Sequence, residues 1–496
     1  MSRLGRLRLF VLVLAATVFL CGATPARAVR IMLYNTLRYP GLNITVPRLL
    51  AFRDIVADAA PDMVIAVEIL DSSTATRFAL DVLEAVNPGE WSLAPFSSLG
   101  DLSVVVYYKT LMFDDLGGAI NITGDPRHTR RWHFRLDGYT SNDASFYPMG
   151  MHLKAGNTQS DIDRRTTTAT NARNSSNAFF SPTDRWFYCG DMNLKVSTEG
   201  AYVAMTGNQA DNDGQAIDIH NPNLFTQNWT NNSVFAFIHS QSTRTTDLGD
   251  GGATGGLDDQ FDFFLLSSQL VQTTGLSLVA GSYRIYGQDG LHFNKSVNDA
   301  PTNADVGQAL ADDLHIASDH LPVLIDLQVP AKVSADQTVL DFGTVTQGTT
   351  AELPLTVSDA ATLADPEDLS YSFASPAGFT APAGTFTQAV GSPGNVHTIA
   401  MDTSNVGVLS GTLVINSNDL DVPALNVTLM GEVVPGIVLG DLSGNGVVGL
   451  EDVPLFVTLL LDPAAASQAD RDTADMNGDM ANDGKDIQPF VIALLP

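Results

Sequence analysis

The first part of the chain, residues 29–328, alternates amphipathic helical patterns with short apolar runs. Residues 47–59 place their apolar side chains on one helical face, and Pro61 ends that pattern. Five apolar runs are typical of buried strands: 29–34, 63–67, 186–189, 261–266 and 323–327. Because strands and helices alternate, the pattern predicts an α/β domain.

Residues 331–434 carry a different pattern, in which Gly, Pro, Ser and Asp turns separate short β-type runs. These runs are 339–342, 353–357, 411–415 and 425–430. Short strands with frequent turns predict an antiparallel β-sandwich, and Pro330 and Pro435 mark its boundaries.

Residues 437–496 contain an internal repeat at an offset of 34 residues, the separation between Asp441 and Asp475. The same offset pairs Asp452 with Asp486 and Phe456 with Phe490. In each copy an acidic loop precedes an apolar segment, 453–461 or 487–495, that suits a short helix. The pattern therefore predicts a small helical unit built from two similar halves.

Residues 1–28 have the build of a secretory signal peptide: three arginines, an apolar run and an Ala26-Arg27-Ala28 end. We expect this segment to be removed and the protein to be secreted or held at the cell surface, as a monomer. No later stretch reaches about 18 consecutive apolar residues, so the sequence predicts no membrane span. Cys189 would be the sole cysteine left, which excludes an internal disulfide.

The chain is strongly acidic, with 26 basic against 55 acidic side chains and a formal charge of −29. The negative electrostatic field of such a chain repels polyanions unless basic residues cluster locally. Residues 127–135 form such a cluster, with four arginines and two histidines. We expect Arg130 and Arg131 to contact substrate phosphate; the alternative is a strand whose alternating positions are basic.

Polar side chains recur at the ends of the predicted strands. Asn35 and Glu68 each follow an apolar run, and Gly190 introduces a turn with two short polar side chains. Asp262 lies among large apolar neighbours, and His320 precedes the last run. Taken singly, each is more often a solvated residue or a turn, but together they indicate one site at the rim of a sheet.

The ordered series resembles the endonuclease/exonuclease/phosphatase superfamily. It consists of Asn35, Glu68, Met151-His152-Leu153-Lys154, Gly190-Asp191-Met192-Asn193, Gln260-Phe261-Asp262-Phe263 and Ser318-Asp319-His320-Leu321-Pro322-Val323. The resemblance covers residues 29–328 and implies a four-layer α/β sandwich, with the active site at one rim of its two central sheets. It also implies a metal-dependent phosphoesterase. Gln260 departs from the pattern, because many relatives carry an arginine there.

The resemblance also assigns roles. Mg²⁺ or Mn²⁺ would be held by Glu68, Asn35 and Asp319, since carboxylate and amide oxygens suit a hard cation. His320 would act as general base, oriented by Asp262. Asp191 and Asn193 would position the nucleophile. His152 would donate a hydrogen bond to a phosphate oxygen.

The sequence leaves the substrate open. An extracellular nuclease is the preferred interpretation. The alternatives are a phosphatase, a sphingomyelinase-like phospholipid phosphodiesterase, and an inactive binding or scaffold protein that docks through its C-terminal unit.

The two acidic loops of the C-terminal unit have calcium-loop spacing. The first offers Asp441, Ser443, Asn445 and Asp452, and the second offers Asp475, Asn477, Asp479, Asp483 and Asp486. The unit resembles a dockerin, which implies bound Ca²⁺ and a cohesin-like or cell-surface partner; a purely structural calcium clip is the alternative. Met480 departs from the glycine expected there, and Pro454 and Pro489 are unusual in such helices. The preceding sandwich is similar to bacterial immunoglobulin-like domains.

Overall fold

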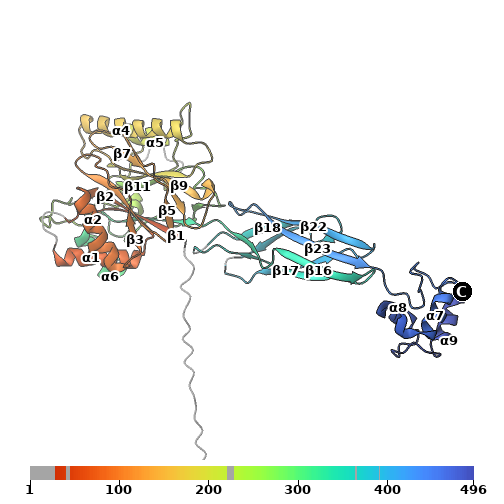
Figure 1. The fold of residues 1–496 in the computed structure, drawn as a ribbon. Coiled ribbons are helices and arrows are strands. Elements are labelled where there is room, and N and C mark those ends of the chain that lie inside the picture. Colours follow the sequence, from red (N-terminus) through yellow and green to blue (C-terminus); the bar gives the residue numbers. More distant parts are fainter. Residues whose placement is uncertain (1–27, 41–44, 221–227, 364–365, 390, 496) are drawn as a thin grey trace, which may run out of the picture.

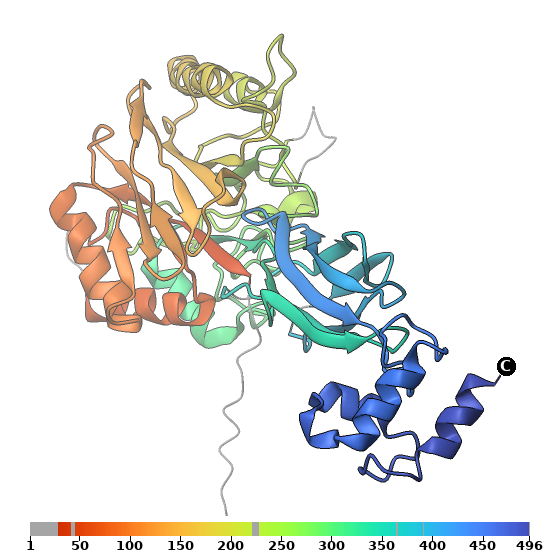
Figure 2. The same cartoon turned by 45° about the vertical axis from the view of Figure 1, so that its right-hand side comes forward.

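The computed structural model describes residues 28–40, 45–220, 228–363, 366–389 and 391–495. The predicted signal peptide, except for Ala28, lies outside these residues. An α/β front domain is followed by a β-sandwich and a small helical unit, and both views place the sandwich between the other two (Figures 1 and 2). No helix in the described ranges combines the length and apolarity needed to cross a bilayer.

The front domain contains two β-sheets. The first has the strand order β12-β14-β1-β2-β4-β3, with β13 also paired to β14. Its strands are β1 (Val29–Asn35), β2 (Met63–Ile69), β3 (Trp91–Leu93), β4 (Ser103–Lys109), β12 (Ser277–Leu278), β13 (Arg284–Ile285) and β14 (Val323–Gln328). The second has the order β11-β10-β9-β7-β6, with β8 paired to β9 and to β5. Its strands are β5 (Phe113–Asp115), β6 (Ile120–Ile122), β7 (Thr129–Arg131), β8 (Phe134–Leu136), β9 (Ser145–His152), β10 (Trp186–Asp191) and β11 (Asp262–Leu266).

Helices cover the outer face of each sheet, which gives four layers (Figure 1). Beside the first sheet are α1 (Val46–Ala59), α2 (Ser72–Phe78), η1 (Ala79–Leu83), α3 (Glu84–Val86) and α6 (Gly307–Ala317). Beside the second are α4 (Gln159–Phe179) and α5 (Gly200–Thr206), while η2 (Asn142–Ala144) and η3 (Ser233–Ile238) are short turns. Buried side chains from both sheets, including Leu33 and Phe187, share one apolar core. The predicted α/β class is confirmed.

Strand direction gathers one set of strand ends at a single rim. β1 and β2 are parallel, as are β9 and β10, so all four end on the same side. β11 and β14 run antiparallel to their neighbours and begin on that side. In the register, Asp191 is paired with both His152 and Asp262. The topology therefore brings together polar residues that are far apart in sequence.

The sandwich consists of a sheet ordered β15-β17-β21-β19 and a sheet ordered β16-β23-β22-β18-β20. The strands are β15 (Val333–Ala335), β16 (Val339–Thr346), β17 (Glu352–Asp359), β18 (Leu369–Ala374), β19 (Phe379–Thr380), β20 (Thr385–Gln388), β21 (Asn395–Met401), β22 (Gly407–Ser417) and β23 (Ala424–Val434). The strand pairs of the sandwich are antiparallel, as expected, with one exception: edge strand β16 pairs with β23 in parallel. The four predicted runs lie within β16, β17, β22 and β23.

The helical unit contains α7 (Asp452–Leu461), η4 (Pro463–Ala465), α8 (Gln468–Ala474) and α9 (Ile487–Leu494). The two repeat-related phenylalanines, Phe456 and Phe490, are buried and stack with ring centroids 3.9 Å apart. The halves of the repeat thus meet at equivalent positions and share one small apolar core.

Candidate functional site

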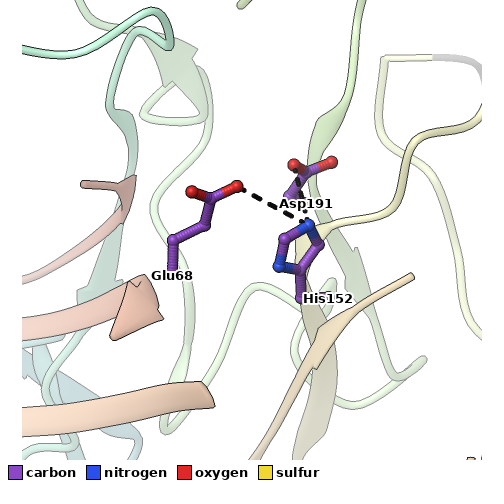
Figure 3. Close-up of side chains that lie close together, drawn as sticks. All are labelled: Glu68, His152 and Asp191. Atoms are coloured by element: carbon purple, nitrogen blue, oxygen red, sulfur yellow. Dashed lines mark ion pairs between the residues drawn. The ribbon is translucent and has the colours of Figure 1, made fainter. Parts of the chain in front are cut away.

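Glu68, His152 and Asp191 converge at the shared rim (Figure 3). One ligand atom from each lies within 4.8 Å of the others. His152 Nε2 is 3.5 Å from Asp191 Oδ2 and 3.9 Å from Glu68 Oε1. Figure 3 shows Glu68 reaching across from one sheet toward the other two side chains. Residues from three separate strands, the outermost two 123 positions apart in sequence, therefore form one compact group.

Asn35, at the end of β1, ties this group together. Its side-chain Nδ2 donates to Asp191 Oδ2 at 3.1 Å and to Glu68 Oε1 at 3.4 Å. Its Oδ1 accepts a hydrogen bond from Leu37 N, which fixes the direction of the amide. Asn35 is fully buried, so these bonds have no competition from solvent.

Glu68 has an unusual backbone. Its φ is +68°, in the left-handed region, where the pairing of β2 with β4 is interrupted by a register shift between Ala66 and Ile69. A non-glycine residue held there costs on the order of 1–3 kcal/mol, and such strain clusters at functional sites. The bulge directs Glu68 toward the opposite sheet. Its buried Oε2 has no hydrogen-bond partner and lies 3.8 Å from Arg38 Nε.

The electrostatics of the group favour a bound cation. Burial, and then the neighbouring Asp319 carboxylate, raise the pKa of Glu68. Burial raises the pKa of Asp191 to about 8, and Asp262 and Glu68 act in the same direction. Two buried carboxylates facing one another, one with an unpartnered oxygen, match the hard oxygen ligands that Mg²⁺ and Mn²⁺ prefer. These residues therefore fit a divalent metal.

His320 and Asp262 form a buried pair beside this group. His320 Nδ1 is 2.7 Å from Asp262 Oδ2, which also accepts a 2.7 Å hydrogen bond from Ser240 Oγ. On its other side, His320 Nε2 is 3.8 Å from Asp191 Oδ2. Burial lowers the pKa of His320, but the Asp262 and Asp319 carboxylates outweigh it and the net pKa is raised. The arrangement places a basic nitrogen next to the metal-binding group.

His152 has the opposite electrostatic state. Burial, followed by the charge of Arg127, lowers its pKa well below the ordinary value, so the ring is neutral near neutral pH. Arg127 supports the end of β9 by donating to the carbonyl of Leu153 at 3.3 Å. A neutral imidazole facing two carboxylates is suited to donating a hydrogen bond rather than to carrying a charge.

Two other predicted residues lie at the edge of the group. Asn193 has a φ of +50°, and its backbone N–H donates to Asp191 Oδ1 at 3.1 Å, so it supports Asp191. Asp319 is not brought into the metal-binding group. Its Oδ2 accepts from Ala253 N at 2.6 Å and from Gln241 Nε2 at 3.5 Å, and its Oδ1 has no hydrogen-bond partner. Its role as a metal ligand stays a prediction.

The two arginines expected to contact phosphate are engaged by the protein itself. Arg130 donates to Asn121 Oδ1 at 2.7 Å and to Pro95 O at 3.2 Å. Arg131 lies over the ring of Phe179, 3.3 Å from its centroid. Both side chains are buried on β7, so their contact with substrate phosphate stays a prediction.

Three residues near the site have no signal in the sequence pattern. Arg38 reaches Glu68, Ser240 reaches Asp262, and Gln241 reaches His320 with a separation of 2.6 Å between Nε2 atoms. Ser240 and Gln241 lie in an irregular segment after η3, outside any predicted strand. Only the tertiary fold brings this segment beside His320.

No protein-family model and no curated protein matches the sequence. Among solved structures, the front domain is similar to D. rerio TDP2 in complex with a single-strand DNA product, with 14% identity, a TM-score of 0.38, and coverage of 61% of this chain and 99% of that one. The human Nocturnin catalytic domain with bound sulfate shows 14% identity and a TM-score of 0.38, over 61% of this chain and 94% of that one. An endonuclease/exonuclease/phosphatase from Beutenbergia cavernae shows 14% identity and a TM-score of 0.34, over 82% of this chain and all of that one.

A buried Glu–His–Asp group that fits a divalent metal stands beside a histidine oriented by an aspartate. This set of residues is equipped for metal-assisted hydrolysis of a phosphoester.

Proposed function

We propose that residues 29–328 are a divalent-metal-dependent phosphodiesterase of the endonuclease/exonuclease/phosphatase type, in an exported protein. The observation that carries this proposal is the contact between two groups. Asp191 belongs to the metal-binding group, and its Oδ2 lies 3.8 Å from the nitrogen of the His320–Asp262 pair. A nucleophile bound to the metal would therefore lie within reach of a base.

Glu68 and Asp191 would hold Mg²⁺ or Mn²⁺, with Asn35 fixing both carboxylates. The ion, when bound, neutralises phosphate charge and lowers the pKa of water. His320 Nε2 accepts the proton of the attacking water, and Asp262 stabilises the resulting imidazolium. His152, neutral and aimed at the same space, donates a hydrogen bond to a phosphate oxygen or to the leaving oxygen.

A nucleic-acid phosphodiester is the substrate we propose first. The front domain is acidic, and the two arginines on β7 are buried, so side chains at the rim are further candidates for phosphate recognition. Arg38 is one candidate, because its side chain is 64% exposed and it already lies beside Glu68. The competing substrates are phosphomonoesters, sugar phosphates and sphingomyelin.

The test is hydrolysis of bis(4-nitrophenyl) phosphate by the purified protein in Mg²⁺, in Mn²⁺ and in chelator, followed by plasmid DNA, RNA, sphingomyelin and phosphorylated sugars. Metal-dependent turnover with a preference for DNA or RNA supports the proposal. Absence of hydrolysis in every metal would favour the binding or scaffold alternative. Mass spectrometry of the exported protein checks its start at Val29.

We propose calcium binding and docking as a second function, carried by residues 437–496. The supporting observation is that both acidic loops fold alike around their first carboxylate. Asp441 accepts from the backbone N–H of Gly444 and Gly446, and Asp475 accepts from Gly478 and Met480. These hydrogen bonds curl each loop around its first aspartate, so that the oxygen-bearing side chains of the loop face a common centre.

The partner surface we propose is the apolar groove of about 280 Å³ between α7 and α9. Its lining residues include Val457, Leu461 and Val491, all exposed. Calorimetry with Ca²⁺ on the full chain and on the D441A/D475A variant tests the calcium sites. Heat of binding in both proteins alike would contradict them, and capture of a cohesin-type domain in Ca²⁺ but not in chelator tests docking.

A further inference from the structure

Gln241 is fixed between the two segments that carry the proposed base and its partner. Its backbone N–H donates to Asp259 O at 3.0 Å, and its carbonyl accepts from the backbone N–H of Asp258 and Asp259. It also forms an isolated β-bridge with His320, and Leu321 N donates to Ser240 O at 2.7 Å. These strand-like backbone contacts of Gln241 and its neighbour Ser240 leave the Gln241 side chain a narrow range of directions.

That side chain ends on the base. Gln241 Nε2 lies 2.6 Å from His320 Nε2 and 3.5 Å from Asp319 Oδ2. The carboxylate can only accept a hydrogen bond, so the amide nitrogen, not the amide oxygen, must face it. When the imidazole is neutral, as a base must be, the same nitrogen donates to the lone pair of His320 Nε2. His320 Nδ1 consequently carries the proton and donates it to Asp262.

We propose that Gln241 is a positioning residue that holds the imidazole of His320 from the side opposite Asp262 and is displaced by the attacking water. The inference rests on the proposed function, since it names a support of the same base. Asp262 fixes one ring nitrogen, and on the other side Asn35 Nδ2 makes only a long contact of 3.4 Å with His320 Nε2, against 2.6 Å for Gln241 Nε2. The amide of Gln241 fixes the second nitrogen and occupies the position from which water would donate its proton.

This arrangement predicts a specific kinetic effect. Gln241→Met keeps the length of the side chain and removes the donor, so the ring loses its second support while the metal-binding group is untouched. We expect kcat to fall roughly 10-fold and KM to stay within about twofold, because orientation of the base matters in the transition state and not in substrate binding. Gln241→Glu should lose more, since it cannot donate and adds a charge beside Asp319.

The control is Gln215→Met, because Gln215 donates to Thr206 O on the far side of the second sheet. An unchanged kcat in folded Gln241→Met, or a raised KM at constant kcat, would overturn the inference while leaving the phosphodiesterase proposal intact. If the wild-type protein hydrolyses nothing, the ¹⁵N signal of His320 Nε2 decides independently. It should shift between wild type and Gln241→Met at a pH where the ring is neutral, and an unshifted signal refutes the contact.

Discussion

Asp191 is a buried carboxylate whose ionisation is opposed by its surroundings. Asn35 and His152 lie beside both its carboxylate and that of Glu68. Burial raises the pKa of Asp191 to about 8. The pKa of Asp191 is therefore higher in the folded protein than in the unfolded chain, where it is near 3.9, so protonation of Asp191 favours the folded state. This contribution is complete at pH values below the unfolded-state pKa and is lost as pH rises through the folded-state pKa. The protein without metal should therefore lose stability between about pH 4 and pH 8.

A divalent cation would remove this penalty by pairing with the ionised carboxylates. We predict that Mg²⁺ raises the melting temperature more at pH 8 than at pH 5, because the carboxylates are largely protonated at the lower pH. Thermal unfolding in Mg²⁺ and in chelator at the two pH values measures the difference. Asp191→Asn should abolish the pH dependence of the Mg²⁺ effect, and an equal shift at both pH values would contradict the prediction.

His320 is the general base in the mechanism that we propose. Replacing His320 by Ala removes the proton acceptor and should lower kcat by roughly 10² to 10⁴. His315→Ala is the matched control, because His315 lies on α6, outside the group that contacts Asp191 and Asp262. Rates are compared on bis(4-nitrophenyl) phosphate with saturating Mg²⁺. A fully active, folded His320→Ala protein would exclude His320 as the base.

At the scale of strands and helices, Gly190 determines how closely β9 and β10 approach. Its φ is +142°, and a Cβ at this position would lie 1.8 Å from Met151 O, a backbone atom that cannot move aside. Gly190 therefore precedes Asp191 for a steric reason: it lets β10 end directly beside the His152 end of β9. The Gly-Asp-Met-Asn motif therefore serves strand packing through its glycine as well as the candidate site through its polar side chains.

Gly190→Ala should destabilise the fold by about 2–4 kcal/mol and disrupt the His152–Asp191 approach. Urea unfolding measures the first effect and turnover the second. Gly249→Ala is the control: its φ is also positive, at +74°, but nothing lies within 4 Å of the added Cβ. Both positions have a positive φ, but only the Cβ at residue 190 meets another atom, so equal destabilisation would show that the contact with Met151 is unimportant.

The sequence predicts strand ends better than it predicts what surrounds them. Asn35, Glu68 and Asp191 follow apolar runs, and parallel pairing places such ends at one rim whatever the loops do. The bulge that turns Glu68 inward has no local signature, since it depends on pairing with β4. The partners of the basic run at 127–135 have no local signature either: Arg127 pairs with Asp101 and Arg130 donates to Asn121, contacts that only the fold supplies.

For the whole molecule, the sandwich joins the front domain at the strand ends opposite the site. β9 runs from Ser145 to His152, and the backbone N–H groups of Thr140 and Ser141, just before it, donate to the Asp421 carboxylate at 2.9 and 2.7 Å. Glu367 similarly accepts from Gly275 N at 2.7 Å. The joint is thus made of carboxylates on the sandwich and backbone donors on the front domain, and it leaves the catalytic rim open.

Each of these charge-assisted bonds contributes about 1.5–3 kcal/mol, so the joint should hold the two domains in one orientation. In the D421A/E367A variant, we predict a broader distribution of interatomic distances in small-angle X-ray scattering, because the joint loses its carboxylate acceptors. Turnover should be unchanged, since both residues are remote from the rim. The control is Asp402→Ala, whose carboxylate caps a turn within the sandwich. Identical scattering from wild type and the double variant would show that packing around Tyr139 and Pro330 fixes the angle without the carboxylates.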